Sequence, residues 1–180
     1  MRDLSKPTVP SDAIQRRFAE ETQARKAAAG PAASLADGEG SPAELREALA
    51  AAVEGLAGEI VALSHAVHDN PEVGYEERFA VSTVADLLRA HGIEPDVGVY
   101  GMETALRAEF TGAVGNADNT DSPAPAIAIL AEYDALPGIG HGCGHNVMAG
   151  NSVGAFLALH ELERRRPGSV PGRVVLQTTP

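Results

Sequence analysis

The feature that most constrains the fold is a strand, a loop, a helix and a second strand in direct succession. The apolar run AIAILAEY covers residues 126–133, the helical pattern MAGNSVGAFLALHELERRR covers residues 148–166, and the run RVVLQTT covers residues 173–179. Two strands joined through a helix run parallel in one sheet, because the crossover returns the chain in the same direction. The first run is apolar until Glu132, which predicts a strand buried on both faces. The sequence therefore predicts an α/β fold with a sheet that is at least partly parallel.

Two helices and another strand precede this unit. Apolar residues recur at three- and four-residue steps over residues 45–67, which is the spacing of an amphipathic helix. A second helix is predicted over residues 76–92 and a strand over residues 104–110. The polar segment at residues 111–125 reads as a loop.

Residues 1–43 differ from the rest of the chain. They mix Ala, Gly, Pro and Ser without a long periodic apolar face. We expect a flexible extension there, with one short helix over residues 12–29 that ends at Gly30-Pro31. The ordered domain is expected over residues 44–180.

Composition limits the partners and the compartment. Lys and Arg number 14 against 25 Asp and Glu, a formal charge of -11, so the basic surface expected of a nucleic-acid-binding protein is missing. A single cysteine builds no intrachain disulfide framework. No stretch approaches about 18 consecutive apolar residues. We expect a soluble, cytoplasmic protein with no nucleic-acid or membrane partner.

The segment ALPGIGHGCGHN, at residues 135–146, holds the only cysteine of the chain between two histidines. Ligands of open α/β sheets bind beyond the carboxyl ends of strands, and this segment follows such an end directly. Its glycines allow backbone conformations that other residues rarely adopt. Five potential metal ligands meet at this corner of the sequence: Glu132, Asp134, His141, Cys143 and His145.

Three interpretations of this segment remain open from the pattern. A thiolate from Cys143 and an imidazole from His145 suit zinc or another borderline divalent metal, although a closed zinc site needs about four ligands. Alternatively, Cys143 is a nucleophile with His141 or His145 as its base, but no residue stands out as the orienting third group. The third interpretation is a glycine-rich turn with a purely structural role.

Two stretches together resemble the N-terminal part of M20-family metallo-amidohydrolases. They are LSHAVHDNPEVGYEE at residues 63–77 and AILAEYDALPGIGHGCGHNVMAG at residues 128–150. The likeness is to the branch of aminobenzoyl-glutamate hydrolases and M20 domain-containing dipeptidases, and it covers about residues 44–180. It implies a three-layer sandwich with a mixed, largely parallel sheet, as in zinc peptidases, of which this chain holds an incomplete part.

The resemblance also implies an activity and a set of site residues. Family members hydrolyse amide bonds in N-acyl amino acids or dipeptide-like substrates with two metal ions, usually zinc or manganese. Carried over by position, Cys143 and His145 are metal ligands, and Asp134 is the carboxylate of the catalytic centre that supports a ligand from behind. Glu132 and Asn146 stand where many relatives carry Asp, which leaves the role of Glu132 open.

Family members continue past the last strand with an element that gives the general-base Glu and a metal ligand. A lid domain, through which they homodimerise, and a segment with further ligands follow. These parts are not found within the 180 residues. A positioned carboxylate must still take the proton in metal-assisted hydrolysis. We therefore expect an N-terminal fragment that would act on small-molecule substrates but is inactive alone. The alternative is a non-catalytic metal-binding or interaction fragment.

Overall fold

The computed structural model describes most of the chain. Its contacts divide the chain into two compact units, Met1–Gly40 and Ser41–Pro180. The described residues are 13–28, 40–112 and 126–180.

In the first unit, helix α1 spans Ala13–Ala28, within the helix predicted over residues 12–29. The rest of the predicted N-terminal extension up to residue 39, and most of the predicted loop at 111–125, lie outside the described residues.

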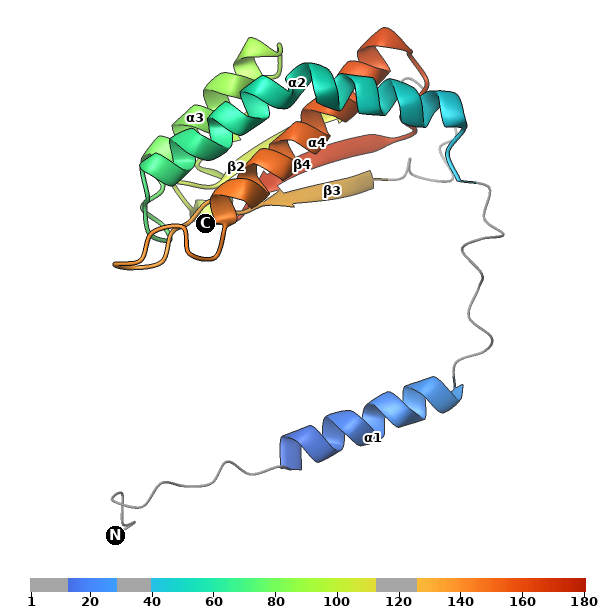
Figure 1. Ribbon diagram of the computed structural model, residues 1–180, viewed down its shortest axis with the longest axis vertical. Coiled ribbons are helices and arrows are strands. Elements are labelled where there is room, and N and C mark those ends of the chain that lie inside the picture. Colours follow the sequence, from blue (N-terminus) through green and yellow to red (C-terminus); the bar gives the residue numbers. More distant parts are fainter. Residues whose placement is uncertain (1–12, 29–39, 113–125) are drawn as a thin grey trace. The chain divides into compact units, whose positions relative to one another are not determined.

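The described residues of the second unit form a four-stranded sheet with three helices and one short 3-10 turn (Figure 1). Its strands lie in the order β1-β2-β4-β3, and they span Asp96–Val97 (β1), Leu106–Thr111 (β2), Arg173–Thr178 (β4) and Ala126–Ala131 (β3). The helices span Ala43–Asp69 (α2), Arg78–Ala90 (α3) and His145–Arg165 (α4), and the 3-10 turn η2 spans Val99–Gly101.

The sheet is mixed, as predicted, and the α/β class is confirmed. Strands β3 and β4 pair in parallel, with Ile127 opposite Val174 and Ala131 opposite Thr178. Strand β2 pairs antiparallel with β4, and β1 pairs antiparallel with β2. The short connection between β1 and β2 requires a reversal of the chain, which only antiparallel neighbours allow. Antiparallel pairing thus has a larger share of the described sheet than the sequence indicated.

Helices α2, α3 and α4 lie over the same face of the sheet (Figure 1). The described residues therefore form two of the three expected layers. The prediction that β3 is buried on both faces is wrong for them, since Ile127 is 61% and Leu130 is 56% exposed. Among the described residues, β3 is an edge strand of the sheet. Successive side chains of a strand alternate between its faces, so the buried Ala131 and the exposed Leu130 lie on opposite faces.

Helices α2 and α4 approach each other closely. A Cβ atom on Gly154 would lie 2.5 Å from Cδ1 of Ile60, and one on Gly150 would lie 3.2 Å from the Ile60 carbonyl oxygen. These contacts leave no room for a side chain at Gly154 unless Ile60 moves. The two glycines of α4 therefore let the Ile60 side chain fill the space between the helices.

Helix α2 is long and apolar enough to cross a membrane by length and composition alone. Core helices of soluble proteins often meet the same criterion. Leu56, Leu63 and Val67 of α2 are buried in the core of this unit, which accounts for part of its apolar character.

A chain of buried polar groups links Tyr133, Thr104, Thr178 and Glu77. The Tyr133 hydroxyl donates to the Thr104 carbonyl and lies 2.9 Å from Oγ1 of Thr178. Thr104 donates to Oε2 of Glu77 at 2.6 Å, and Thr178 accepts from the Leu106 amide at 2.6 Å. Burial raises the pKa of Tyr133 well above its ordinary value, so the hydroxyl keeps its proton. These bonds offset part of the cost of burying the polar groups, because Oε1 of Glu77 is buried without a hydrogen-bond partner among the described residues.

The carboxylate of Glu72 caps the first turn of α3. Its Oε1 accepts from the Phe79 amide at 2.9 Å and its Oε2 from the Ala80 amide at 3.0 Å. Both amides belong to the set that has no partner within the helix, and the negative charge faces the positive end of the helix dipole. Glu72 thereby fixes where α3 begins.

We expect Glu72→Ala to lower the free energy of unfolding by about 1–2 kcal/mol, the usual effect of removing a helix cap. Urea denaturation followed by circular dichroism measures the change. Glu76→Gln is the matched control, because that exposed side chain makes no contact with the amides of α3. Equal stability of the two variants would rule out a capping role.

Ion pairs between Glu161 and two arginines in the last turn of α4 should make the stability of the protein depend on pH. Hydrogen bonds from Arg164, at 2.7 and 2.9 Å, and from Arg165 hold the pKa of Glu161 at about 2, below its ordinary 4.5. A depressed pKa stabilises the fold above the unfolded-state value, and this stabilisation is lost as pH falls from 4.5 towards 2.

We expect Glu161→Gln to destabilise the protein near pH 7 by less than about 1 kcal/mol, because solvent screens these pairs. The difference from wild type should shrink as pH falls from 4.5 towards 2. Thermal unfolding across that range checks this, and a difference independent of pH would contradict it.

Candidate metal centre

The predicted site segment connects β3 to α4, and it ends at a helix that starts earlier than expected. Helix α4 begins at His145, not at Met148. Gly144 precedes it with φ of 82°, a left-handed conformation that glycine adopts without strain. Its carbonyl accepts from the amides of Val147 and Met148 and so starts the first turn. His145 is thereby the first residue of a regular helix.

His145 lies between two carboxylates. Its Nδ1 is 2.6 Å from Oδ1 of Asp134 and 3.1 Å from the Asp134 carbonyl oxygen. Its Nε2 is 3.2 Å from Oε2 of Glu132. The side chains of His145 and Asp134 are 21% and 27% exposed, and that of Glu132 is 41% exposed. The contact with Asp134 on one side and Glu132 on the other fixes the orientation of the ring.

The loop that carries these residues is anchored to the turn between α2 and α3. The Ala135 amide donates to the Glu72 carbonyl at 2.7 Å, and the Leu136 amide donates to the Gly140 carbonyl at 3.0 Å. Gly140 has φ of 76°, which allows this tight reversal. The segment PEVGYEE, which the sequence singled out only as part of the resemblance, thus supports the site loop.

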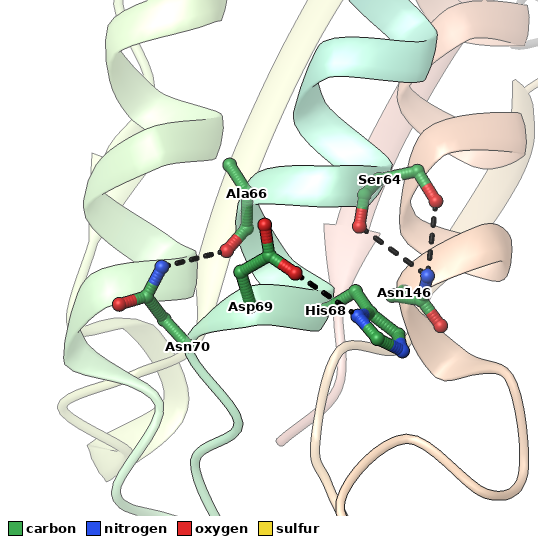
Figure 2. Close-up of polar contacts among 6 residues, drawn as sticks. All are labelled: Ser64, Ala66, His68, Asp69, Asn70 and Asn146. Carbon is green, nitrogen blue, oxygen red and sulfur yellow. Dashed lines mark hydrogen bonds and ion pairs between the residues drawn. The ribbon is translucent and has the colours of Figure 1, made fainter.

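Asn146 ties the first turn of α4 to α2. Figure 2 shows its side-chain amide directed at Ser64, where it donates to Oγ at 3.0 Å and to the carbonyl at 3.3 Å. Asn146 is 7% exposed, so this contact is nearly dry. No local sequence signal points to it, because the partners are 82 residues apart. A groove beside the contact is lined by Ser64, His65, His68, Asp69, Asn146 and Val147.

Cys143 and His141 are not drawn into the arrangement around His145. Cys143 is a free, exposed thiol. Both ring nitrogens of His141 are shielded from solvent, and its ring lies 6.2 Å from that of His68. Burial lowers the pKa of His141, an effect increased by the nearby His68 and opposed by the Val67 backbone.

Among residues 13–28, 40–112 and 126–180, no three His, Cys, Asp or Glu side chains converge on a point that could hold a metal. The structure does bring Glu132, Asp134 and His145 into contact, but in an arrangement that leaves no common position for a metal, and His141 and Cys143 lie outside this group. Nor does any histidine of the described segments hydrogen-bond Cys143, so the geometry of a thiol nucleophile with its base is not formed there.

Comparisons with known proteins give sequence and structural likenesses. The chain is 34% identical over 142 residues to the Xaa-Arg dipeptidase of Mus musculus, a match that covers 76% of this chain and 32% of the dipeptidase. It is 28% identical over 110 residues to a subunit of the p-aminobenzoyl-glutamate hydrolase of Escherichia coli, a match that covers 52% of this chain and 21% of the relative. The chain thus spans a third or less of these curated relatives.

A solved structure has the same fold. A dinuclear metal-binding peptidase of the M20 family from Bacillus subtilis superposes with a TM-score of 0.53 at 22% identity, over 69% of this chain and 35% of the peptidase. No protein-family model matches the chain. The sequence relatives and the fold nonetheless agree with the two motifs at residues 63–77 and 128–150. The chain therefore belongs to the M20 family of amidohydrolases and peptidases.

Proposed function

We propose that this chain supplies part of the metal centre of an enzyme that hydrolyses amide bonds in N-acyl amino acids or dipeptide-like compounds. The observation that carries the proposal is the fixed orientation of His145. Oδ1 of Asp134 lies 2.6 Å from Nδ1 of His145. His145 comes two residues after Cys143, in the segment that follows the carboxyl end of β3. This is where α/β sheets bind ligands.

Two side chains of the site segment carry donor atoms that suit a divalent metal. Cys143 and His145 would hold it, because thiolate and imidazole are the donors that zinc prefers, and manganese favours oxygen donors instead. A bound metal of this kind supplies Lewis acidity that polarises the scissile carbonyl. Asp134 orients the imidazole of His145, as partners behind metal-binding histidines commonly do. A thiol ligand must stay reduced, so we place the protein in the cytoplasm.

We propose further that the 180-residue chain alone turns over no amide. The two carboxylates beside His145 are both engaged with its ring, and no three donors converge within the described residues. Hydrolysis needs a carboxylate free to take a proton. More donors and the base would come from polypeptide outside these 180 residues. If none exists, the alternative is a non-catalytic protein that binds metal weakly.

A chimera tests the proposed function. Residues 128–150 would replace the matching segment of a full-length M20 aminobenzoyl-glutamate hydrolase, and release of the amino acid product would be followed chromatographically with and without chelator. We expect metal-dependent hydrolysis by the chimera and none by the 180-residue chain.

Within the chimera, Cys143→Ser and His145→Ala should each lower turnover by at least about 100-fold, because each removes a metal donor. Ile139→Ala is the control, since that loop side chain is 71% exposed and offers no donor atom. A chimera that folds, binds metal and hydrolyses nothing would overturn the proposed function. Turnover by the 180-residue chain alone would overturn its inactivity.

The orienting role of Asp134 is tested by Asp134→Asn. An amide in place of the carboxylate no longer enforces the Nδ1–H form of His145, so zinc affinity should fall by about 10–100-fold. Competition with a chromophoric zinc chelator measures the affinity. Asp69→Asn is the matched control, because Asp69 lies 3.2 Å from a different histidine, the exposed His68. Equal losses in both variants would show a general effect of charge and not one of orientation.

A further inference from the structure

We propose that the C-terminal half of α4 makes an acid-sensitive contact with α2, α3 and β2. The contact is held while His160 is neutral, and it loosens when His160 takes up a proton. His160 lies about four helical turns beyond His145, the first residue of α4. The inference therefore concerns a part of the unit that is remote from the candidate metal centre, and it goes beyond the proposed function.

The His160 ring takes part in the packing of α4 on the sheet. It meets the ring of Phe110, on β2, nearly edge-on, with the ring centroids 5.2 Å apart and the planes at 67°. Phe110 in turn packs against Phe156, one turn earlier on α4, at 5.4 Å. His160 also lines a groove of about 380 Å³ between α4, α2 and the end of α3. The imidazole is therefore partly withdrawn from water, which disfavours its charged form.

The charged residues of α4 give a proton on His160 little compensation. Glu161 accepts hydrogen bonds from Arg164, at 2.7 and 2.9 Å, and from Arg165. Its negative charge is thus already met by two guanidinium groups. Both arginines line the same groove as His160, so a proton on the imidazole would add a third positive charge there.

The neighbouring elements offer no free carboxylate to His160 within the described residues. His91, at the end of α3, lines the groove, and its Nε2 lies 2.9 Å from Oε2 of Glu59 on α2. Glu59 is therefore engaged with the other histidine. The charged side chains of β2, Arg107 and Glu109, alternate along the strand with the residues that face the helices, so they lie on its other face.

The direction of the pH effect follows from this environment. The pKa of His160 lies below its ordinary value of 6.5, chiefly because of burial; Glu161 opposes this change, and Arg164 and His91 add to it. A proton therefore binds more readily when the ring has left the groove. The contact is at full strength above pH 6.5 and weakens as pH falls below that value. Glu161 responds only below 4.5, so the two effects occupy different pH ranges.

The loosening should be confined to the second half of α4, because the first half is held to α2 by other contacts. Gly150 and Gly154 pack against Ile60, and Asn146 donates to Oγ of Ser64 at 3.0 Å. None of these contacts contains a group that titrates near neutral pH. Acid should therefore release the end of α4 while its start keeps its place.

Hydrogen–deuterium exchange of the purified 180-residue chain in EDTA tests the inference between about pH 7.5 and 5.5, with rates corrected for the intrinsic effect of pH. In wild type, the protection of the amides of residues 157–166 should fall severalfold below pH 6.5. The limit for a single proton is about tenfold per pH unit. The amides of residues 149–156 should keep their protection.

Three variants separate the charge on His160 from its packing. His160→Gln removes the titrating group, so protection of residues 157–166 should no longer depend on pH. Arg164→Gln leaves Glu161 with more charge to offer a protonated His160, so the loss of protection in acid should shrink. His65→Gln is the matched control, because it removes an exposed histidine of α2, and it should behave as wild type.

An equal loss of protection in wild type and in His160→Gln would overturn the inference, and so would wild-type protection that stays constant over this pH range. Circular dichroism checks that each variant is folded. If His160→Gln fails to fold, His160→Phe keeps an aromatic ring against Phe110 and cannot titrate, so it should show the same independence of pH. Neither metal nor substrate is present, so either result leaves the proposed function untouched.

Discussion

The close contact between α2 and α4 is the constraint on which the site depends. Gly150 and Gly154 leave space that the Ile60 side chain occupies, and a methyl group at Gly154 would meet that side chain at 2.5 Å. Asn146 adds a polar link to Ser64 near the same crossing. Because α4 is a regular helix from its first residue, fixing its axis also fixes the backbone of His145. The position of the imidazole is therefore set by helix packing two turns away and not by the loop alone.

The loop after β3 then completes the environment of that imidazole. Its first residues lie at the end of a strand paired with β4, and the Ala135 amide is held by the Glu72 carbonyl. Asp134 and Glu132 flank Tyr133 in this segment, and Tyr133 is buried and hydrogen-bonded to Thr178. Tyr133 is anchored in the core, and both of its acidic neighbours contact the ring of His145. Cys143 belongs instead to the exposed, glycine-rich part of the loop.

Local patterns predicted the βαβ unit and the two preceding helices. They also predicted the corner of the sheet where the acidic residues and His145 meet. These features depend on apolar periodicity and strand ends, which can be recognised from residues close together in the sequence. Local patterns did not predict the start of α4 at His145, since Gly144 is a start signal only in its left-handed conformation. Nor did they predict the cap from Glu72 or the link between Asn146 and Ser64, whose partners meet only after folding. The exposure of β3 was missed because an apolar run does not reveal whether its strand is central or at an edge.

Strand β3 leaves one side of its backbone without a neighbouring strand among the described residues. The Ala131 carbonyl accepts from the Thr179 amide, so the carbonyl of Leu130 points to the opposite, open side. There it accepts a hydrogen bond of 2.6 Å from the Ser152 hydroxyl of α4. An unprotected strand edge is a template for intermolecular β-pairing and aggregation. A chain adding to β3 would have to displace Ser152 at its Leu130 position, so a helical hydroxyl occupies the carbonyl that such a chain would otherwise use there.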